Sequence, residues 1–526
     1  MSTLTTHVYG AFREARYDDA IKALNVQRQS FPRSRAALSL LGYAYYHVSD
    51  YRNAAAVYEE LSAVCPEVDE YKLYYAQCLY KCGFYAEASR ASLRIDSKEL
   101  RLQVLALRRA IKYEEDDLST CKSLLDQCMQ DDPDTLVHYA AICVKEQRFE
   151  EARAKYAEAT QILGFTPPEI QINLSLCDFK EQKFASALKG LGLVIEKAVR
   201  EHPELSVGSA TDGIEVRSVG NSLLLQETFL VEAFNLKCAI EYEMGNFEAA
   251  REALSDMPPR NEHELDAITL HNAALLNVDT KPSNAFTKLN YLLSNPPFPP
   301  EAYGNLLLLH CKFGFTDVAA DFIAENGQLT FKFLSGELYD FLDATIITKS
   351  SPQEAFKKFD DLAAKHVENL RKLTKKIQDA RISRDNEAIK LALKNYDAAL
   401  EQYMPVLMAQ AKIYWDHSHY EAVEKLFRQS AEFCSDHAAW KLNVAHTFFV
   451  QEKFSEAIKY YEPIVKKTND LLKIPAVVLA NLCVAFIMTS ANEAAEDLMR
   501  DIEKQEENTL QQHFHLCIVN LVIGTL

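Results

Sequence analysis

Glycine is scarce in this chain, with 15 residues among 526. Together with 48% hydrophobic and 25% charged residues, this composition suits a helical protein. Long apolar runs are absent too, because none reaches the roughly 20 residues that a membrane helix needs. The N-terminus lacks the basic, apolar and small-residue pattern of a signal peptide. We therefore expect no direct insertion into a membrane.

Catalytic motifs are also missing, since the sequence contains no P-loop, GxGxxG, HExxH or GxSxG pattern. His417 and His419 flank Ser418 in a predicted turn, and Cys434 and His437 follow nearby. A metal site would need more ligands converging there, so we interpret them as ordinary turn residues. The sequence predicts no enzyme, no metal and no cofactor.

Basic residues are fewer than acidic ones: the chain has 57 Lys and Arg and 75 Asp and Glu, so its net charge is −18. This charge argues against nucleic acid and anionic membranes as main partners. The 12 cysteines form no paired CxxC motif and lie mostly at the spacing of helix cores. They indicate reduced, buried thiols in a cytosolic compartment.

What the chain does contain is a repeat. Three tyrosines are each followed three residues later by alanine, which gives the pairs Tyr17–Ala20, Tyr51–Ala54 and Tyr85–Ala88. Successive pairs are 34 residues apart. A 34-residue period with small residues at fixed points is typical of tetratricopeptide (TPR) helix hairpins. Because TPR arrays are binding surfaces, the period also argues against an enzyme.

The second repeat shows the packing rule most clearly. Its first helix carries a small residue, Gly42, where the second helix is expected to cross closely. The second helix carries Tyr51, then Ala54, then Tyr58, and this spacing places all three on one face. Related patterns recur as far as Cys483 and Ala495. They predict an all-α TPR solenoid that forms a right-handed superhelix.

Two segments interrupt the rhythm. Residues 201–222 are rich in Gly and Ser and predict an inserted loop. Residues 352–402 lack glycine, carry charge throughout and predict an elongated helix pair, either a spacer or a dedicated contact arm. The expected organisation is N-terminal repeats over 1–200, the loop over 201–222, central repeats over 223–350, elongated charged helices over 351–403, and C-terminal repeats over 404–526.

The last stretch, 511–526, resembles the first helix of a repeat without the second helix. Either the chain was cut there, or a partner covers Leu516, Val519 and Leu521.

The inner groove of a TPR array is lined by fixed positions of the first helix in each repeat. Here those positions are mainly apolar and aromatic, which suits an extended proline-rich or hydrophobic segment rather than a charged terminus. A single residue of this row can equally belong to the core, but the row as a whole favours a groove. The predicted partner-binding residues are Tyr43, Tyr46, Leu73, Tyr80, Val137, Val144, Ile172, Leu176, Phe179, Tyr242, Trp415 and Phe449.

Several stretches go beyond generic TPR positions. They are SRAALSLLGYAYY (34–46), HPELSVGSATDGIEVRSVGN (202–221), EAFNLKCAIEYE (232–243), VLMAQAKIYW (406–415), WKLNVAHTFF (440–449), YEPIVKK (461–467) and VVLANLCVAFIMTS (477–490). With them the chain resembles, over nearly its whole length, the TPR subunit of the intraflagellar transport B complex, the fleer or TPR-domain-30 family.

This resemblance implies a core subunit of intraflagellar transport particles in cilia and flagella, with a cytoplasmic pool and a ciliary basal location. It implies a superhelix wrapped around a proline-rich stretch of another B-core subunit. It also implies support of cilium assembly and of axonemal tubulin polyglutamylation without catalysis. The alternative is a chaperone-type TPR cofactor or adaptor that binds peptide tails transiently; a basic, salt-sensitive groove would favour it.

Overall fold

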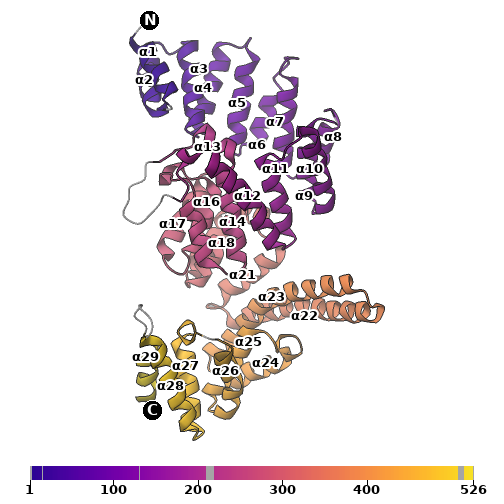
Figure 1. Cartoon of the computed structure of the whole chain (residues 1–526), viewed down its shortest axis with the longest axis vertical. Coiled ribbons are helices and arrows are strands. Elements are labelled where there is room, and N and C mark those ends of the chain that lie inside the picture. The colour runs from indigo at the N-terminus through magenta and orange to yellow at the C-terminus, as the bar shows by residue number, and fades with distance from the viewer. Residues whose placement is uncertain are drawn as a thin grey trace. The chain divides into compact units, whose positions relative to one another are not determined.

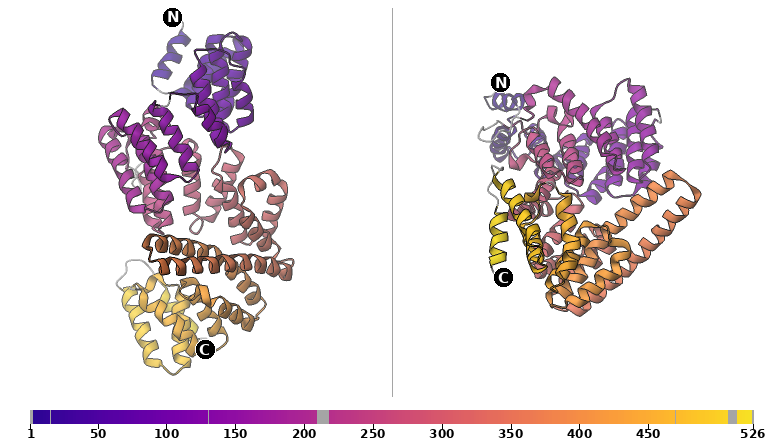
Figure 2. Two further views of the ribbon diagram at one scale, coloured as in Figure 1. Left: turned by 90° about the vertical axis from the view of Figure 1, so that its right-hand side faces the viewer. Right: turned by 60° about the horizontal axis from the view of Figure 1, so that its bottom comes forward.

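The computed structural model describes residues 3–14, 16–129, 131–208, 218–468, 470–507 and 514–524. Within these ranges the chain is built of helices and their connecting turns, without β-strands (Figures 1 and 2). The chain divides into two compact units, Met1–Leu306 and Leu307–Leu526. No helix in the described ranges combines the length and apolarity needed to cross a membrane.

The first unit consists of successive antiparallel helix hairpins. Its helices are α1 Thr3–Arg13, α2 Tyr17–Ser30, α3 Arg35–His47, α4 Tyr51–Val64, α5 Asp69–Lys81, α6 Tyr85–Ser92, α7 Arg101–Glu114, α8 Leu118–Leu125, α9 Pro133–Lys145, α10 Phe149–Leu163, α11 Pro168–Lys180, α12 Phe184–Glu201, η1 Pro203–Leu205, α13 Leu223–Thr228, α14 Leu230–Glu243, α15 Phe247–Asp256, η2 Glu262–Glu264, α16 Ala267–Leu276 and α17 Pro282–Ser294. Helix α18, Glu301–Lys312, contains the division between the units.

The second unit is also made of helices and includes the long helices α22 and α23. Its helices are α19 Thr316–Glu325, α20 Gly327–Phe333, α21 Gly336–Ile347, α22 Pro352–Ser383, α23 Asn386–Asp416, α24 Tyr420–Cys434, α25 Ala438–Val450, α26 Phe454–Lys467, η3 Leu471–Lys473, α27 Ala476–Met488, α28 Asn492–Glu507 and α29 His515–Gly524.

Burial confirms the predicted TPR solenoid. Ala20, Ala54 and Ala88 are each 0% exposed, which places the repeating alanine inside every one of these three hairpins. At Gly42 of α3, a Cβ atom would lie 2.8 Å from the Cζ atom of Tyr58 in α4. The small residue therefore allows the close crossing of the two helices that the repeat pattern predicts.

The elongated pair is longer than the segment singled out in the sequence. Helix α22 spans Pro352–Ser383, and α23 runs from Asn386 to Asp416 without a break at the internal Pro405. The two pack along each other through residues such as Leu370 and Leu373 of α22 and Tyr403 of α23. The C-terminal half of α23, expected to be the first helix of a new repeat, is thus continuous with the arm.

The final helix, α29, packs one face against its own chain. Val519 is 0% exposed and joins a core with α27 and α28, and Leu516 packs against the same cluster. Leu521 is exposed. The first part of the stretch 511–526, up to residue 513, lies outside the described residues.

Candidate peptide-binding groove

Pairs of aromatic side chains five residues apart close the turns of the hairpins. Ring centroids are 5.3 Å apart for Tyr46 and Tyr51, and 6.2 Å apart for Phe179 and Phe184. In each case the first ring ends one helix and the second begins the next. The backbone reverses at a residue with positive φ between them, Ser49 at 64° in the first hairpin. Equivalent pairs are Tyr80–Tyr85, Tyr242–Phe247, Trp415–Tyr420 and Phe449–Phe454.

Most of the predicted groove residues occupy this first position of the pair. Tyr46, Tyr80, Phe179, Tyr242, Trp415 and Phe449 all do so, and Val144 stands at the same distance before Phe149. All seven are half-buried. Burial raises the pKa of Tyr46 and of Tyr80 to about 12, so both phenols remain neutral at physiological pH. These side chains therefore pack one face against their own turn and remain partly accessible to solvent.

Two of the predicted residues are buried, which corrects their assignment to the groove. Leu73 is 1% exposed and belongs to the same apolar cluster as Leu41 and Tyr58. Ile172 is 8% exposed and packs with Leu191 and neighbouring residues. Their helix faces turn toward the adjacent hairpins, so both residues stabilise the contacts between hairpins.

The remaining three predicted residues keep accessible surface. Tyr43 is the only one of the twelve that is exposed, at 47%, and its ring lies 4.2 Å from that of His47. Val137 and Leu176 are half-buried, and Val137 packs against the core around Ala140 and Tyr156.

An apolar cleft of about 720 Å³ brings two of the predicted residues together. Phe179 of α11 and Tyr242 of α14 line it with Ile268 and Leu275 of α16. The three helices are the first helices of successive hairpins, which is where a TPR groove is expected. We refer to this cleft as the central groove.

One wall of the central groove was missed by the sequence analysis. Pro297, Phe298, Pro299 and Pro300, in the connection between α17 and α18, line it together with Glu301. The run PPFPP at 296–300 is visible in the sequence. Its place could not be inferred, because it lies more than a hundred residues from Phe179 along the chain.

The described lining of the central groove is mainly apolar, and its charged side chains are acidic. Glu243 and Glu301 are its ionisable carboxylates, and no lysine or arginine appears among its described lining residues. Burial lowers the pKa of His271, the one histidine in the lining, and its Nε2 atom lies 3.0 Å from Asn305 Nδ2. Such a groove offers contact to apolar groups and no cation for a terminal carboxylate.

Hydrogen bonds join both ends of the inserted loop to the end of α15 and the connection between α15 and α16. Gly208 N donates to Asp256 O at 2.8 Å, and Val219 N donates to Pro259 O at 2.9 Å. Ser218 Oγ donates to a Glu264 carboxylate oxygen at 2.6 Å. Residues 209–217, the middle of the loop predicted over 201–222, lie outside the described residues.

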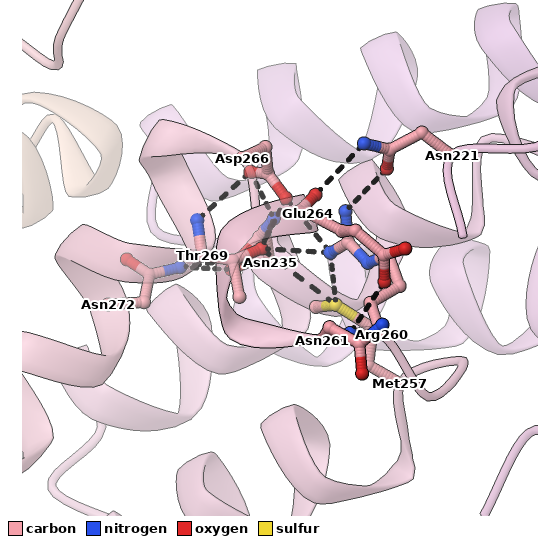
Figure 3. A network of polar contacts seen from close by, with 9 residues as sticks. All are labelled: Asn221, Asn235, Met257, Arg260, Asn261, Glu264, Asp266, Thr269 and Asn272. Carbon is pink, nitrogen blue, oxygen red and sulfur yellow. Dashed lines mark hydrogen bonds and ion pairs between the residues drawn. The ribbon is translucent and has the colours of Figure 1, made fainter. Parts of the chain in front are cut away.

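A buried arginine organises the same region (Figure 3). Arg260 has a side chain that is 2% exposed and pairs with Asp266 at 3.0 Å. Asp266 also accepts from Thr269 N at the start of α16. Thr269 in turn accepts from Asn235 Nδ2 of α14 at 2.9 Å. Arg260 Nη1 also donates to Asn221 Oδ1 at 3.4 Å, so the network joins α14, α16 and the end of the inserted loop.

A second, polar cleft of about 680 Å³ borders this network. Its lining includes Asp50 before α4, Arg52 of α4 and Lys81 of α5, together with Glu232 and Arg260. Its mixed charges differ from the apolar lining of the central groove. It contains none of the twelve predicted residues.

The described residues include no group of three or more His, Cys, Asp or Glu side chains arranged to hold a metal ion. His417 Nδ1 lies 2.8 Å from the Ile413 carbonyl oxygen, a contact within its own helix end. The twelve cysteines are free thiols. Burial raises the pKa of several of them, Cys78 and Cys238 to about 12, so these thiols stay protonated and unreactive.

Comparison with known protein families supports the sequence resemblance. Residues 302–526 match the model of the intraflagellar transport protein 70 C-terminal domain. Residues 38–197 match the model of intraflagellar transport protein 56. Solved structures are less similar: the APC/C hetero-tetramer Cut9-Hcn1 matches over 99% of this chain and 96% of that chain with a TM-score of 0.36 and 11% identity. That similarity is too low to support an argument.

Curated relatives match over almost the entire chain. Intraflagellar transport protein 70A of Xenopus tropicalis is 54% identical over 529 residues, covering 99% of this chain and 81% of the relative. The protein of the same name from Danio rerio is 53% identical with the same coverage. Intraflagellar transport protein 70A1 of Mus musculus is 52% identical over 539 residues, again with 99% and 81% coverage. The chain therefore belongs to the intraflagellar transport protein 70 family.

Proposed function

We propose that this intraflagellar transport subunit is a non-catalytic scaffold that holds an extended proline-rich or hydrophobic segment of another B-core subunit. The observation that carries the proposal is the central groove, where Phe179, Tyr242 and Ile268 present apolar surface in one cleft. An extended proline-rich segment is stiff before binding and loses little conformational entropy when it docks on such a surface.

Family membership supports a cilium-related location. Within that location we propose the ciliary base and a cytoplasmic pool, with a role in assembling the cilium or flagellum. Support of axonemal tubulin polyglutamylation would be indirect, by delivery of cargo. TPR-type transport proteins are not enzyme-like, which agrees with the scaffold role.

The central groove and its neighbouring turns suggest how a partner segment would be held. The exposed parts of Phe179 and Tyr242 supply ring faces. Asn272 Nδ2 donates to Asn235, so Asn272 offers its side-chain oxygen as an acceptor for the peptide backbone. The wall formed by Pro297–Pro300 leaves no backbone N–H groups at the prolines to compete for those contacts. Binding should then depend mainly on apolar burial.

Co-purification with a proline-rich segment of a B-core subunit tests the proposal. We expect co-elution in size-exclusion chromatography that persists from about 0.1 M to about 1 M salt, because apolar contacts are not screened. Phe179→Asp and Tyr242→Asp should each abolish it, while helix content by circular dichroism is retained.

Phe331→Asp is the matched control, since Phe331 is 92% exposed and lies in the other unit. It should co-elute like the unmodified chain. Binding that disappears at high salt would instead favour the transient chaperone-type adaptor. Binding that survives both groove substitutions would overturn the assignment of the central groove.

A further inference from the structure

The second unit carries two exposed surfaces of opposite charge. One is the outer half of the α22–α23 hairpin, residues 371–394, which we call the arm tip. The other is the outer face of α28. Neither surface is explained by the proposed peptide groove.

The arm tip is basic in an otherwise acidic chain. Residues 371–394 contain eight lysines or arginines and three acidic residues, a net charge of +5, whereas the whole chain has −18. Leu373 and Ile377 face the hairpin core, and the basic side chains point outward. Four of these outward-facing residues, Arg371, Lys375, Lys376 and Arg381, are exposed and form no ion pair with any described residue.

Helix α28 has the opposite character. It contains seven acidic and two basic residues, a net charge of −5 over 16 residues. Ala495 and Ile502 are buried against the rest of the unit. Glu493, Glu496, Asp501 and Glu503 lie on the exposed face, with no ion pair to another residue in the described part of the chain.

Each charged surface has exposed apolar residues beside it. At the arm tip, Ile382 is 81% and Leu391 is 61% exposed. Next to α28, Phe514 is 62% and Leu521 of α29 is 67% exposed, and α29 packs on α28. Exposed large apolar side chains next to a charged patch are typical of protein contact sites.

The arm tip and α28 do not neutralise each other within one copy. No ion pair or hydrogen bond joins Arg371, Lys375, Lys376 or Arg381 to α28 in the described ranges. The arm's hydrogen bonds and ion pairs over residues 371–393 are confined to the hairpin itself. Both surfaces are therefore available to a second molecule.

We propose that the arm tip of one copy of this chain binds the acidic face of α28 on a second copy. Charge complementarity between two surfaces of the same chain favours a second copy over a nucleic acid, which the net charge of −18 would repel. Because the two surfaces differ, one contact leaves each copy with one unused surface for the next. The arm then forms a contact between two copies and is more than a spacer.

Sedimentation velocity of the full chain over a concentration series tests the proposal. At about 0.1 M salt we expect reversible association that grows with concentration, and at about 1 M salt its loss, because screening shortens the reach of the charges from roughly 10 Å to 3 Å. A chain that stays monomeric at every concentration and salt would overturn the proposal.

Charge reversal separates the two surfaces. One variant carries Arg371→Glu, Lys375→Glu, Lys376→Glu and Arg381→Glu; the other carries Glu493→Lys, Glu496→Lys, Asp501→Lys and Glu503→Lys. Each alone should lower the association constant at least about tenfold. Their mixture should restore association, because each reversed surface then meets an opposite charge.

A control with the same change in net charge as the arm-tip variant carries Lys22→Glu, Lys189→Glu, Arg200→Glu and Lys425→Glu, four exposed positions outside both surfaces. It should associate like the unmodified chain. Equal loss in this control, or a mixture that fails to associate while both variants keep their helix content, would refute the pairing of the arm tip with α28. Combining both reversed sets in one chain should also restore association, which tests the pairing even if one single-set variant folds poorly.

Discussion

The ring of Tyr58 lies directly against Gly42, where a Cβ atom would come within 2.8 Å of its Cζ atom. Tyr58 is 5% exposed and packs with Leu41 and Leu73 in one cluster. Leu41 and Leu73 are themselves buried, at 0% and 1% exposed, so a shift of the ring would disturb this cluster. The closeness of α3 and α4 thus depends on the absence of a side chain at one position.

Gly42→Ala should therefore destabilise the first unit although alanine favours helices. We expect a loss of about 1–3 kcal/mol from overpacking, set against a gain of roughly 1 kcal/mol in helix propensity. Urea unfolding followed by circular dichroism measures the difference. Gly10→Ala in α1 is the control, since nothing lies within 4 Å of a Cβ atom there, and it should be neutral or stabilising.

Ala88→Trp should destabilise the third repeat, and Ala86→Trp should not. Ala88 is 0% exposed at the crossing of the two helices, while Ala86, in the same helix, is exposed. The buried substitution should cost about 1–3 kcal/mol or more. Thermal melts of the two variants should separate clearly. Equal melting temperatures would contradict the register of the repeat.

Asp266→Ala should weaken the region around the inserted loop. It leaves Arg260, 2% exposed, without its ion-pair partner and removes the cap of α16. We expect a loss of roughly 2–4 kcal/mol, less than for a fully buried pair because the Asp266 carboxylate is 35% exposed. Asp266→Asn, which keeps a side-chain acceptor at the cap, should lose less.

Asp117→Ala separates capping from the effect of the buried charge. Asp117 caps α8 through Thr120 N, and its ion pair, at 3.7 Å, is with Lys112, whose side chain is 29% exposed. Its loss should cost about 1 kcal/mol. If Asp266→Ala proved no worse in urea unfolding, the Arg260 pair would have no role in stability.

Acidification should destabilise the first unit through His271. Burial lowers the pKa of this side chain below its ordinary value of 6.5, so the unfolded state takes up the proton more readily than the folded state. The stability that the neutral ring provides is complete above the ordinary pKa and declines as the pH falls below it. Unfolding free energies measured at about pH 7.5 and about pH 5.5 should show this decline.

His271→Gln should lose less stability over the same pH interval, because glutamine does not titrate. The exposed His263→Gln is the control and should keep the pH dependence of the unmodified chain. An unchanged slope in the His271 variant would show that other groups account for the decline.

The repeat could be predicted because its information is local. Tyr51, Ala54 and Tyr58 lie within one helix, and their spacing alone places them on one face. Their burial follows once a second helix packs on that face. The period of 34 residues predicts which segment of the chain forms that second helix. The family resemblance rests on the same kind of evidence, since each of its stretches is continuous in the chain.

The groove residues were predicted less well for a physical reason. The rule for inner positions identifies the side of a helix, but not what the neighbouring hairpin or turn already covers. Leu73 and Ile172 are buried by adjacent hairpins, and Phe449 is half-covered by Phe454 across its turn. Such coverage depends on how closely each pair of helices approaches.

The sequence by itself determined the all-α class, the repeat register and the family, because helical periodicity and small residues at crossings are properties of short segments. Only the tertiary structure decided that Pro297–Pro300 form a wall beside Phe179 and Tyr242, and that Arg260 joins the inserted loop to α14 and α16. These contacts join residues far apart in the chain, and their geometry follows from the packing of many helices, which no local pattern encodes.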